Sequence, residues 1–122
     1  MGNEIYDDLD ELPPAPRVDI PDADLVLLEG AARAIGAMRV EVVDGEGYVN
    51  LHLADSSIVH SWNPLTFSGD ALDLAVRRRL EIYIHKQDTR MVCGNLEPTT
   101  EQHGDDAGAA TRRAITRAAS RT

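Results

Sequence analysis

The sequence predicts an α/β fold of the α+β class, in which an antiparallel sheet of four or five strands is covered by about three helices to form a sandwich. Three observations lead to this prediction. Apolar residues recur at helical spacing in three segments, and they alternate with polar residues in the segments between them. Short turns join consecutive strand segments, which favours antiparallel pairing. The expected order is helix, two or three strands, helix, two strands, helix.

The chain is expected to divide into an acidic, flexible N-terminal segment, residues 1–21, and a single domain, residues 22–122. Several prolines in the first segment oppose both helix and central strand, namely Pro13, Pro14, Pro16 and Pro21. The first helix is predicted to begin at Asp22, because Asp22 and Asp24 favour the positive end of a helix dipole. Its apolar stripe comprises Leu25, Leu28, Ala32 and Ile35.

Three strands are predicted after this helix. Residues 38–43 and 48–53 alternate apolar and polar side chains, and residues 44–47 between them are typical of a turn. Residues 58–60 follow a second turn and add a short third strand. These segments predict a small antiparallel meander.

The second half of the domain is predicted to contain two helices and two strands. Residues 70–79 predict a helix, and residues 80–85 and 91–93 predict strands joined by a turn. The buried stripe of this helix is expected to comprise Leu72, Ala75 and Val76. Residues 97–104 are expected to form a polar loop.

A last helix is predicted to start at Asp105 or Asp106 and to run to about Ser120. Small residues form a narrow face on it that suits close packing on a sheet, namely Ala110, Ala114, Ile115 and Ala118. These small residues, together with a short exposed strand edge, also favour a homodimer or a higher homo-oligomer.

Composition excludes several function classes. The formal net charge is −9, and residues 1–24 hold eight acidic residues against one arginine, so direct binding to nucleic acid is not expected. No apolar stretch predicts a membrane span or a secretory signal. Cys93 is the single cysteine, which suits a reducing cytosol, and we interpret it as a small buried hydrophobe.

No catalytic motif is recognised. The four histidines are widely separated, without metal-ligand spacing, and no nucleophile elbow or phosphate-binding glycine loop is present. We therefore expect no catalytic residues, no metal and no cofactor. The four histidines are His52, His60, His85 and His103.

Two motifs resemble a known family. The first is Trp62-Asn63-Pro64-Leu65-Thr66, followed by Gly69-Asp70-Ala71-Leu72 and by Leu74-Ala75-Val76. The second is Gly104-Asp105 followed by Ala109-Ala110-Thr111-Arg112-Arg113-Ala114-Ile115. Together they resemble the phage ABA-sandwich domain over roughly Leu25 to the C-terminus, and more distantly the NinX-like phage proteins. The resemblance implies a small phage or prophage accessory protein with an α/β/α sandwich and no assigned biochemistry.

The loop before the second helix is the candidate binding site. Trp62 could stack on a base or ring, and Asn63 and Thr66 could bind polar groups. Backbone N–H groups around Gly69 would attract an anion at the helix start, although Asp70 can fill that position as a cap.

Arg112 and Arg113 would complete this site if the last helix lies near the loop, because guanidinium groups bind phosphates. The alternative interpretation is structural: Trp62 lies in the core, Asp70 caps the helix, and both arginines pair with acidic neighbours or lie in solvent.

These observations lead to three hypotheses of function. The first is a non-enzymatic phage accessory protein that acts in the cytoplasm of an infected bacterial host, in counter-defence or host takeover, by sequestering a nucleotide-derived signalling molecule. The second is an inhibitor of a host defence protein, in which acidic residues imitate nucleic acid. The third is a small hydrolase. The partner-docking residues of the second hypothesis are Asp7, Asp8, Asp10, Glu11, Arg77 and Arg78.

Overall fold

The structure is a computed structural model that describes residues 16–122. The described part is an α+β fold with three helices and six strands. The helices are α2 (Asp22–Ala34), α3 (Ser68–Arg77) and α4 (Ala107–Ser120), and the strands are β1 (Ala37–Val42), β2 (Val49–Leu53), β3 (Ile58–Trp62), β4 (Glu81–Ile84), β5 (Asp88–Val92) and β6 (Thr99–Gln102). None of the helices in this part of the chain is long and apolar enough to cross a membrane.

The six strands form two antiparallel sheets, with the orders β1-β2-β3 and β4-β5-β6. The prediction of one sheet with four or five strands was therefore wrong. The strand that it lacked is β6, which lies within the expected polar loop over residues 97–104. Its backbone pairs with β5, and Thr99 lies buried opposite Met91. A strand made of polar residues has no apolar alternation to reveal it.

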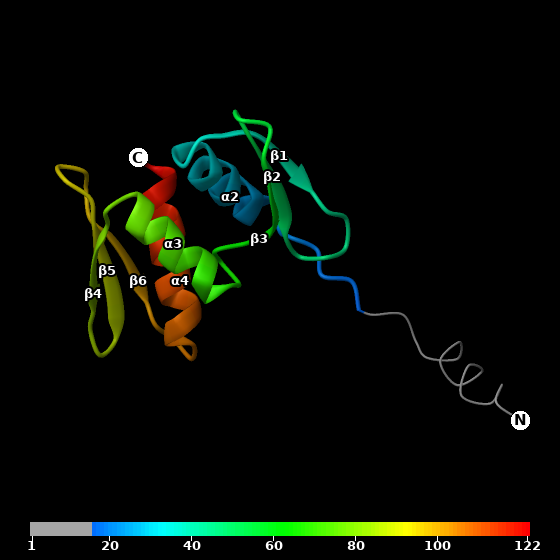
Figure 1. The fold of residues 1–122 in the computed structure, drawn as a ribbon. Coiled ribbons are helices and arrows are strands. Elements are labelled where there is room, and N and C mark those ends of the chain that lie inside the picture. The colour runs from blue at the N-terminus through cyan, green and yellow to red at the C-terminus, as the bar shows by residue number, and fades with distance from the viewer. Residues whose placement is uncertain (1–15) are drawn as a thin grey trace, which may run out of the picture.

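The helices lie between the two sheets, with β1, β2 and β3 on one side and β4, β5 and β6 on the other (Figure 1). α4 is central to this layer, because it contacts α2, α3, β5 and β6. A sandwich of helices and sheets is therefore present, but its layer order in the described part of the chain differs from the single helix-covered sheet that was predicted and from the α/β/α order that the resemblance implies. Small residues allow α4 to be surrounded closely in this way. Its buried residues are Ala110, Ala114, Ile115, Thr116, Ala118 and Ala119.

α3 begins at Ser68, two residues earlier than predicted, and it buries a different face. Leu72 and Val76 were expected in the buried stripe, but they are 61 % and 67 % exposed. Alanines permit α3 to lie close to α4, while the larger side chains remain on the surface. The residues that α3 buries are Ala71, Leu74 and Ala75.

The part of the predicted N-terminal segment that the structure describes contacts the domain. The backbone N–H of Val18 donates a hydrogen bond to the Gly45 carbonyl, in the turn between β1 and β2, at 2.9 Å. The guanidinium group of Arg17 pairs with Asp44 at 2.8 Å in the same turn. The chain is therefore attached to the first sheet before α2 begins.

Candidate functional site

Trp62 ends β3 and lies in the core. Its side chain is 2 % exposed, and it lies opposite Val49 in the ladder of β2 and β3. Ser61 has a φ of 56°, and the register of this ladder shifts between Val49 and Leu51. Such a bulge redirects the side chains that follow it, and here it leaves the indole buried in the core. The indole is almost fully buried and borders only a small pocket of about 120 Å³, which agrees with the structural alternative that places Trp62 in the core.

Asn63 and Asp70 hold the loop in place. Asn63 is buried, its Nδ2 donates to the Gly47 carbonyl at 2.8 Å, and its Oδ1 accepts from the backbone N–H of Leu65 at 2.9 Å. The backbone N–H of Asn63 donates to Oδ2 of Asp70 at 2.9 Å. Burial raises the pKa of Asp70, and this hydrogen bond partly offsets that effect. Both side chains are thus engaged by the protein and give the loop its shape.

Thr66 and Gly69 lie on the surface of the same loop and of the first turn of α3. The backbone N–H of Thr66 donates to the Asn63 carbonyl at 3.1 Å, which closes a turn. The space where a side chain at Gly69 would lie is open. These two residues are accessible, but the aromatic surface that was to accompany them is buried with Trp62.

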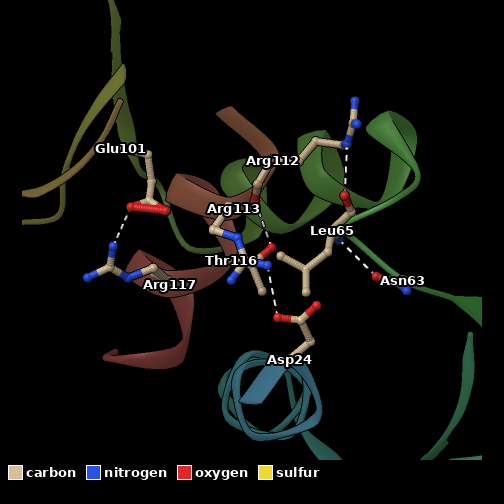
Figure 2. Close-up of polar contacts among 8 residues, drawn as sticks. All are labelled: Asp24, Asn63, Leu65, Glu101, Arg112, Arg113, Thr116 and Arg117. Atoms are coloured by element: carbon tan, nitrogen blue, oxygen red, sulfur yellow. Dashed lines mark hydrogen bonds and ion pairs between the residues drawn. The ribbon is translucent and has the colours of Figure 1, made fainter. Parts of the chain in front are cut away.

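Arg112 connects α4 to the loop, so the expected proximity of these two segments is present (Figure 2). Its Nε donates to the Leu65 carbonyl at 3.0 Å, and its Nη1 lies 3.3 Å from Oγ of Ser68. A guanidinium group has five N–H donors, so these contacts leave several available. Within residues 16–122, no carboxylate lies at ion-pair distance from Arg112.

Arg113 points to another part of the molecule. Its Nη2 forms an ion pair with Asp24 of α2 at 2.9 Å (Figure 2). One turn later, Arg117 forms an ion pair with Glu101 of β6. The two arginines therefore join α4 to the elements on either side of it. The ion pair directs Arg113 away from the loop that Arg112 contacts, and it agrees with the structural alternative in which this arginine pairs with an acidic neighbour.

A groove lies between α3, α4 and β4, and Arg112 is part of its wall. It encloses about 400 Å³, which is within the range of about 300–1,000 Å³ typical of small-molecule sites. Its surface is almost entirely apolar, and among the described residues Arg112 is the one charged side chain that lines it. The lining residues are Ser68, Ala71, Leu72, Ile82, Ile84, Ala107, Gly108, Thr111, Arg112 and Ile115.

This groove was not predicted from the sequence. Leu72 was placed in the core, and Ile82 and Ile84 were predicted only as part of a strand over residues 80–85. The structure leaves Leu72 and Ile84 61 % and 65 % exposed, and both line the groove. The available signal was an excess of apolar residues on the second predicted helix, which has more of them than one buried face requires.

A chain of hydrogen bonds runs from the groove into the second sheet. Oγ1 of Thr111, in the groove wall, lies 2.8 Å from Oγ1 of Thr89, which is fully buried. The same Thr89 oxygen lies 2.8 Å from Nε2 of His103. This chain satisfies polar groups beneath the groove and fixes the orientation of the Thr111 hydroxyl.

The arginines proposed for partner docking have different environments. Arg77 pairs with Asp73 on the surface of α3 at 2.7 Å. Arg78 donates to the Ala34 carbonyl at 3.0 Å and to Oγ1 of Thr122 at 2.8 Å, so it joins the end of α2 to the C-terminus. Arg78 thus has a structural role. The acidic residues of that hypothesis lie outside the described residues.

No group of three or more His, Cys, Asp or Glu side chains among residues 16–122 is placed to hold a metal ion. Cys93 is partly buried, and its Sγ lies 3.8 Å from the Arg78 carbonyl. Comparison with family models, with curated proteins and with solved structures gave no significant match.

Proposed function

We propose that this chain is a non-enzymatic binding protein that sequesters an organic anion, of about the size of a nucleotide, in the groove between α3, α4 and β4. The observation that carries the proposal is the pairing of an apolar groove with one arginine in its wall. An apolar or aromatic body would pack on Leu72, Ile82 and Ile84, and a phosphate or carboxylate would bind Arg112.

Electrostatics favours an anion at this place. The whole chain has a net charge of −9, yet no carboxylate from residues 16–122 lines the groove. The first turns of α3 and α4 border the groove at Ser68 and Ala107, and the positive end of each helix dipole adds to the charge of Arg112. Asp106 caps α4 and Asp70 lies in the first turn of α3, so Arg112 is the group in the groove wall that would bind the anion.

The biological setting is part of the same proposal. It depends on the resemblance of the two motifs alone, since the layer order of the structure differs from an α/β/α sandwich. That resemblance is to phage proteins and suggests a phage accessory protein that acts in the cytoplasm of its bacterial host. Sequestering a nucleotide-derived signalling molecule would serve counter-defence without turnover, because stoichiometric binding needs a site and an anion-binding residue but no catalytic group.

Calorimetric titration with linear and cyclic nucleotides, and with the aromatic sulfonate ANS as a general probe, tests the proposal. Arg112→Leu should weaken binding about tenfold or more, because a charge-assisted contact of about 1.5–3 kcal/mol is lost. Leu72→Asp should also weaken it, because a carboxylate then faces the anion.

Matched controls are Arg90→Leu and Val26→Asp, which make the same changes at exposed sites outside the groove. They should leave the affinity unchanged. The proposal fails if none of the probes binds, or if binding is equally strong in the two groove variants and in wild type.

A further inference from the structure

No strand from residues 16–122 pairs with one edge of β4, because β4 is the outer strand of its sheet and pairs with β5 on the other side. At the hairpin end, the backbone N–H of His85 donates to the Asp88 carbonyl at 2.8 Å. Hydrogen-bonded pairs alternate along an antiparallel ladder, so Glu81 and Tyr83 direct their backbone groups toward β5. Ile82 and Ile84 therefore direct their N–H and C=O groups outward.

This edge of the described sheet has neither a bulge nor a proline, two of the features that usually protect strand edges. Its register with β5 is regular over all four residues. The ladders that contain β1 and β3 have register shifts, and β6 is polar and follows Pro98. Within the described part of the chain, β4 is thus the edge most open to a further strand.

The edge is complementary to itself. In an antiparallel pair of two β4 strands with Tyr83 opposite Tyr83, Ile82 of one copy lies opposite Ile84 of the other. These two residues then exchange both backbone hydrogen bonds, and their side chains meet on the groove side of the sheet. On the other face of the sheet, Glu81 of one copy is paired with His85 of the second copy, which Lys86 follows in the sequence. Backbone hydrogen bonding and apolar contact thus match in the same register, and His85, which contacts Asp88 of its own copy at 2.7 Å, faces the Glu81 carboxylate of the other.

We propose that a second copy of this chain docks on β4, and that two three-stranded sheets join into one six-stranded sheet across a two-fold axis at Tyr83. The dimer would bury side chains that are exposed in the single chain, since Tyr83 is 47 % exposed and Ile84 is 65 % exposed. The axis is perpendicular to the sheet, so both α3 helices lie on the same face of the joined sheet.

The dimer can be tested separately from the anion proposal, although Ile82 and Ile84 line the groove and also meet the second copy on that side of the sheet. Glu81, Tyr83 and His85 alternate with the groove-lining Ile82 and Ile84, so their side chains point to the other face of the sheet. Substitutions at these three positions therefore test the dimer without changing the groove wall.

Sedimentation velocity of the full chain over a range of concentrations tests the dimer. Wild type should convert from 13.3 kDa to twice that mass as its concentration rises. Tyr83→Lys should remain a monomer, because two ammonium groups would lie directly opposite each other across the axis. Val42→Lys, at the exposed edge strand β1, is the matched control and should dimerise like wild type.

A charge exchange gives a sharper test of the register. Glu81→Lys and His85→Glu should each dimerise more weakly than wild type, because each brings like charges together. An equimolar mixture of the two variants should form a heterodimer, in which the lysine introduced in one copy faces the glutamate introduced in the other. The amide protons of Ile82 and Ile84 should exchange more slowly as the concentration of wild type rises.

A wild-type protein that stays monomeric up to millimolar concentration overturns the proposal and leaves the edge to a strand of another protein. A dimer that persists in Tyr83→Lys, or a mixture of the charge variants that does not associate, places the interface elsewhere and also overturns it. Circular dichroism of each variant confirms that it is folded.

Discussion

At the scale of single residues, a bulge decides where the only tryptophan of the chain lies. The sequence around Trp62 is polar and contains a proline, which is typical of a loop, and Trp62 was assigned to that loop. β3 instead continues to Trp62 after Ser61 adopts a positive φ. Serine has no preference for that conformation, so its sequence carries no signal for the bulge. Asp70 was expected to cap the second helix, but no side chain caps α3, whose N-cap residue is Phe67. The Asp70 carboxylate instead accepts a hydrogen bond from the backbone N–H of Asn63, which lies before the helix.

Asp70 also gives the protein a titratable group whose charge opposes folding. Burial holds the pKa of Asp70 above its ordinary value of 3.8. The folded protein therefore binds this proton more tightly than the unfolded chain does. This contribution to stability is fully present below pH 3.8, and it is lost as the pH rises through the folded-state pKa.

Asp70→Asn should remove this pH dependence. The amide oxygen can still accept the hydrogen bond from the backbone of Asn63, and no charge is buried. The free energy of unfolding of the variant, relative to wild type, should therefore increase between pH 3 and pH 7. Urea denaturation at several pH values measures this free energy of unfolding. Asp105→Asn, in an exposed turn, is the control. If the difference in the free energy of unfolding between the variant and wild type stays the same at every pH, burial does not shift the pKa of Asp70.

At the scale of elements, regular amphipathic segments were predictable and the packing partners were not. α2 and α4 agree closely with the periodicity of their sequences. The stripe of α3 was predicted one position off, because Leu72 and Ala71 are both apolar and only the neighbour α4 selects between them. β6 was missed because Thr99 is polar and yet buried.

The contact between α2 and α4 depends on a glycine. A Cβ atom added at Gly30 would lie 2.9 Å from Cβ of Ser120, which is closer than real side chains approach. Alanine usually stabilises an exposed helical position relative to glycine by about 0.5–1 kcal/mol. At Gly30 the helices would have to separate, and their close packing would be lost.

Gly30→Ala should therefore destabilise the protein by about 1–3 kcal/mol, the range typical of overpacking. Gly69→Ala is the matched control, since the space around Gly69 is open and this substitution should be neutral or stabilising. The double variant Gly30→Ala with Ser120→Gly should recover part of the loss, because it removes the opposing Cβ. Thermal and urea unfolding measure all three. Equal effects of the two alanine substitutions would contradict this explanation.

At the scale of the whole molecule, the two sheets share no strand within the described residues, and the helical layer is what connects them. The α+β class was predictable from periodicity, because local patterns determine which segments are helices or strands. The order of layers was not, since amphipathic helices can cover a sheet or lie between two. The side chains of α4 resolve this choice: its buried residues are mostly alanines, so α2, α3, β5 and β6 can all pack closely against it.

This connection predicts that the two sheets unfold together. Met91 lies on β5 of the second sheet and is 1 % exposed, whereas Trp62 reports on the first sheet. Met91→Ala should destabilise the protein by about 2–5 kcal/mol, as expected for truncation of a buried side chain. If α4 couples the sheets, the urea midpoint measured by Trp62 fluorescence should fall as far as the midpoint measured by circular dichroism.

Met38→Ala, at a side chain that is 74 % exposed on β1, is the control and should shift neither midpoint by much. The two probes distinguish joint unfolding of the sheets from independent unfolding. If the sheets unfold independently, the fluorescence transition of Met91→Ala stays at its wild-type position, and its circular dichroism transition splits into two. Coincident shifts of the two midpoints mean that the two sheets unfold as one cooperative unit, which α4 joins. The groove beside α4 would then open only when the entire fold unfolds.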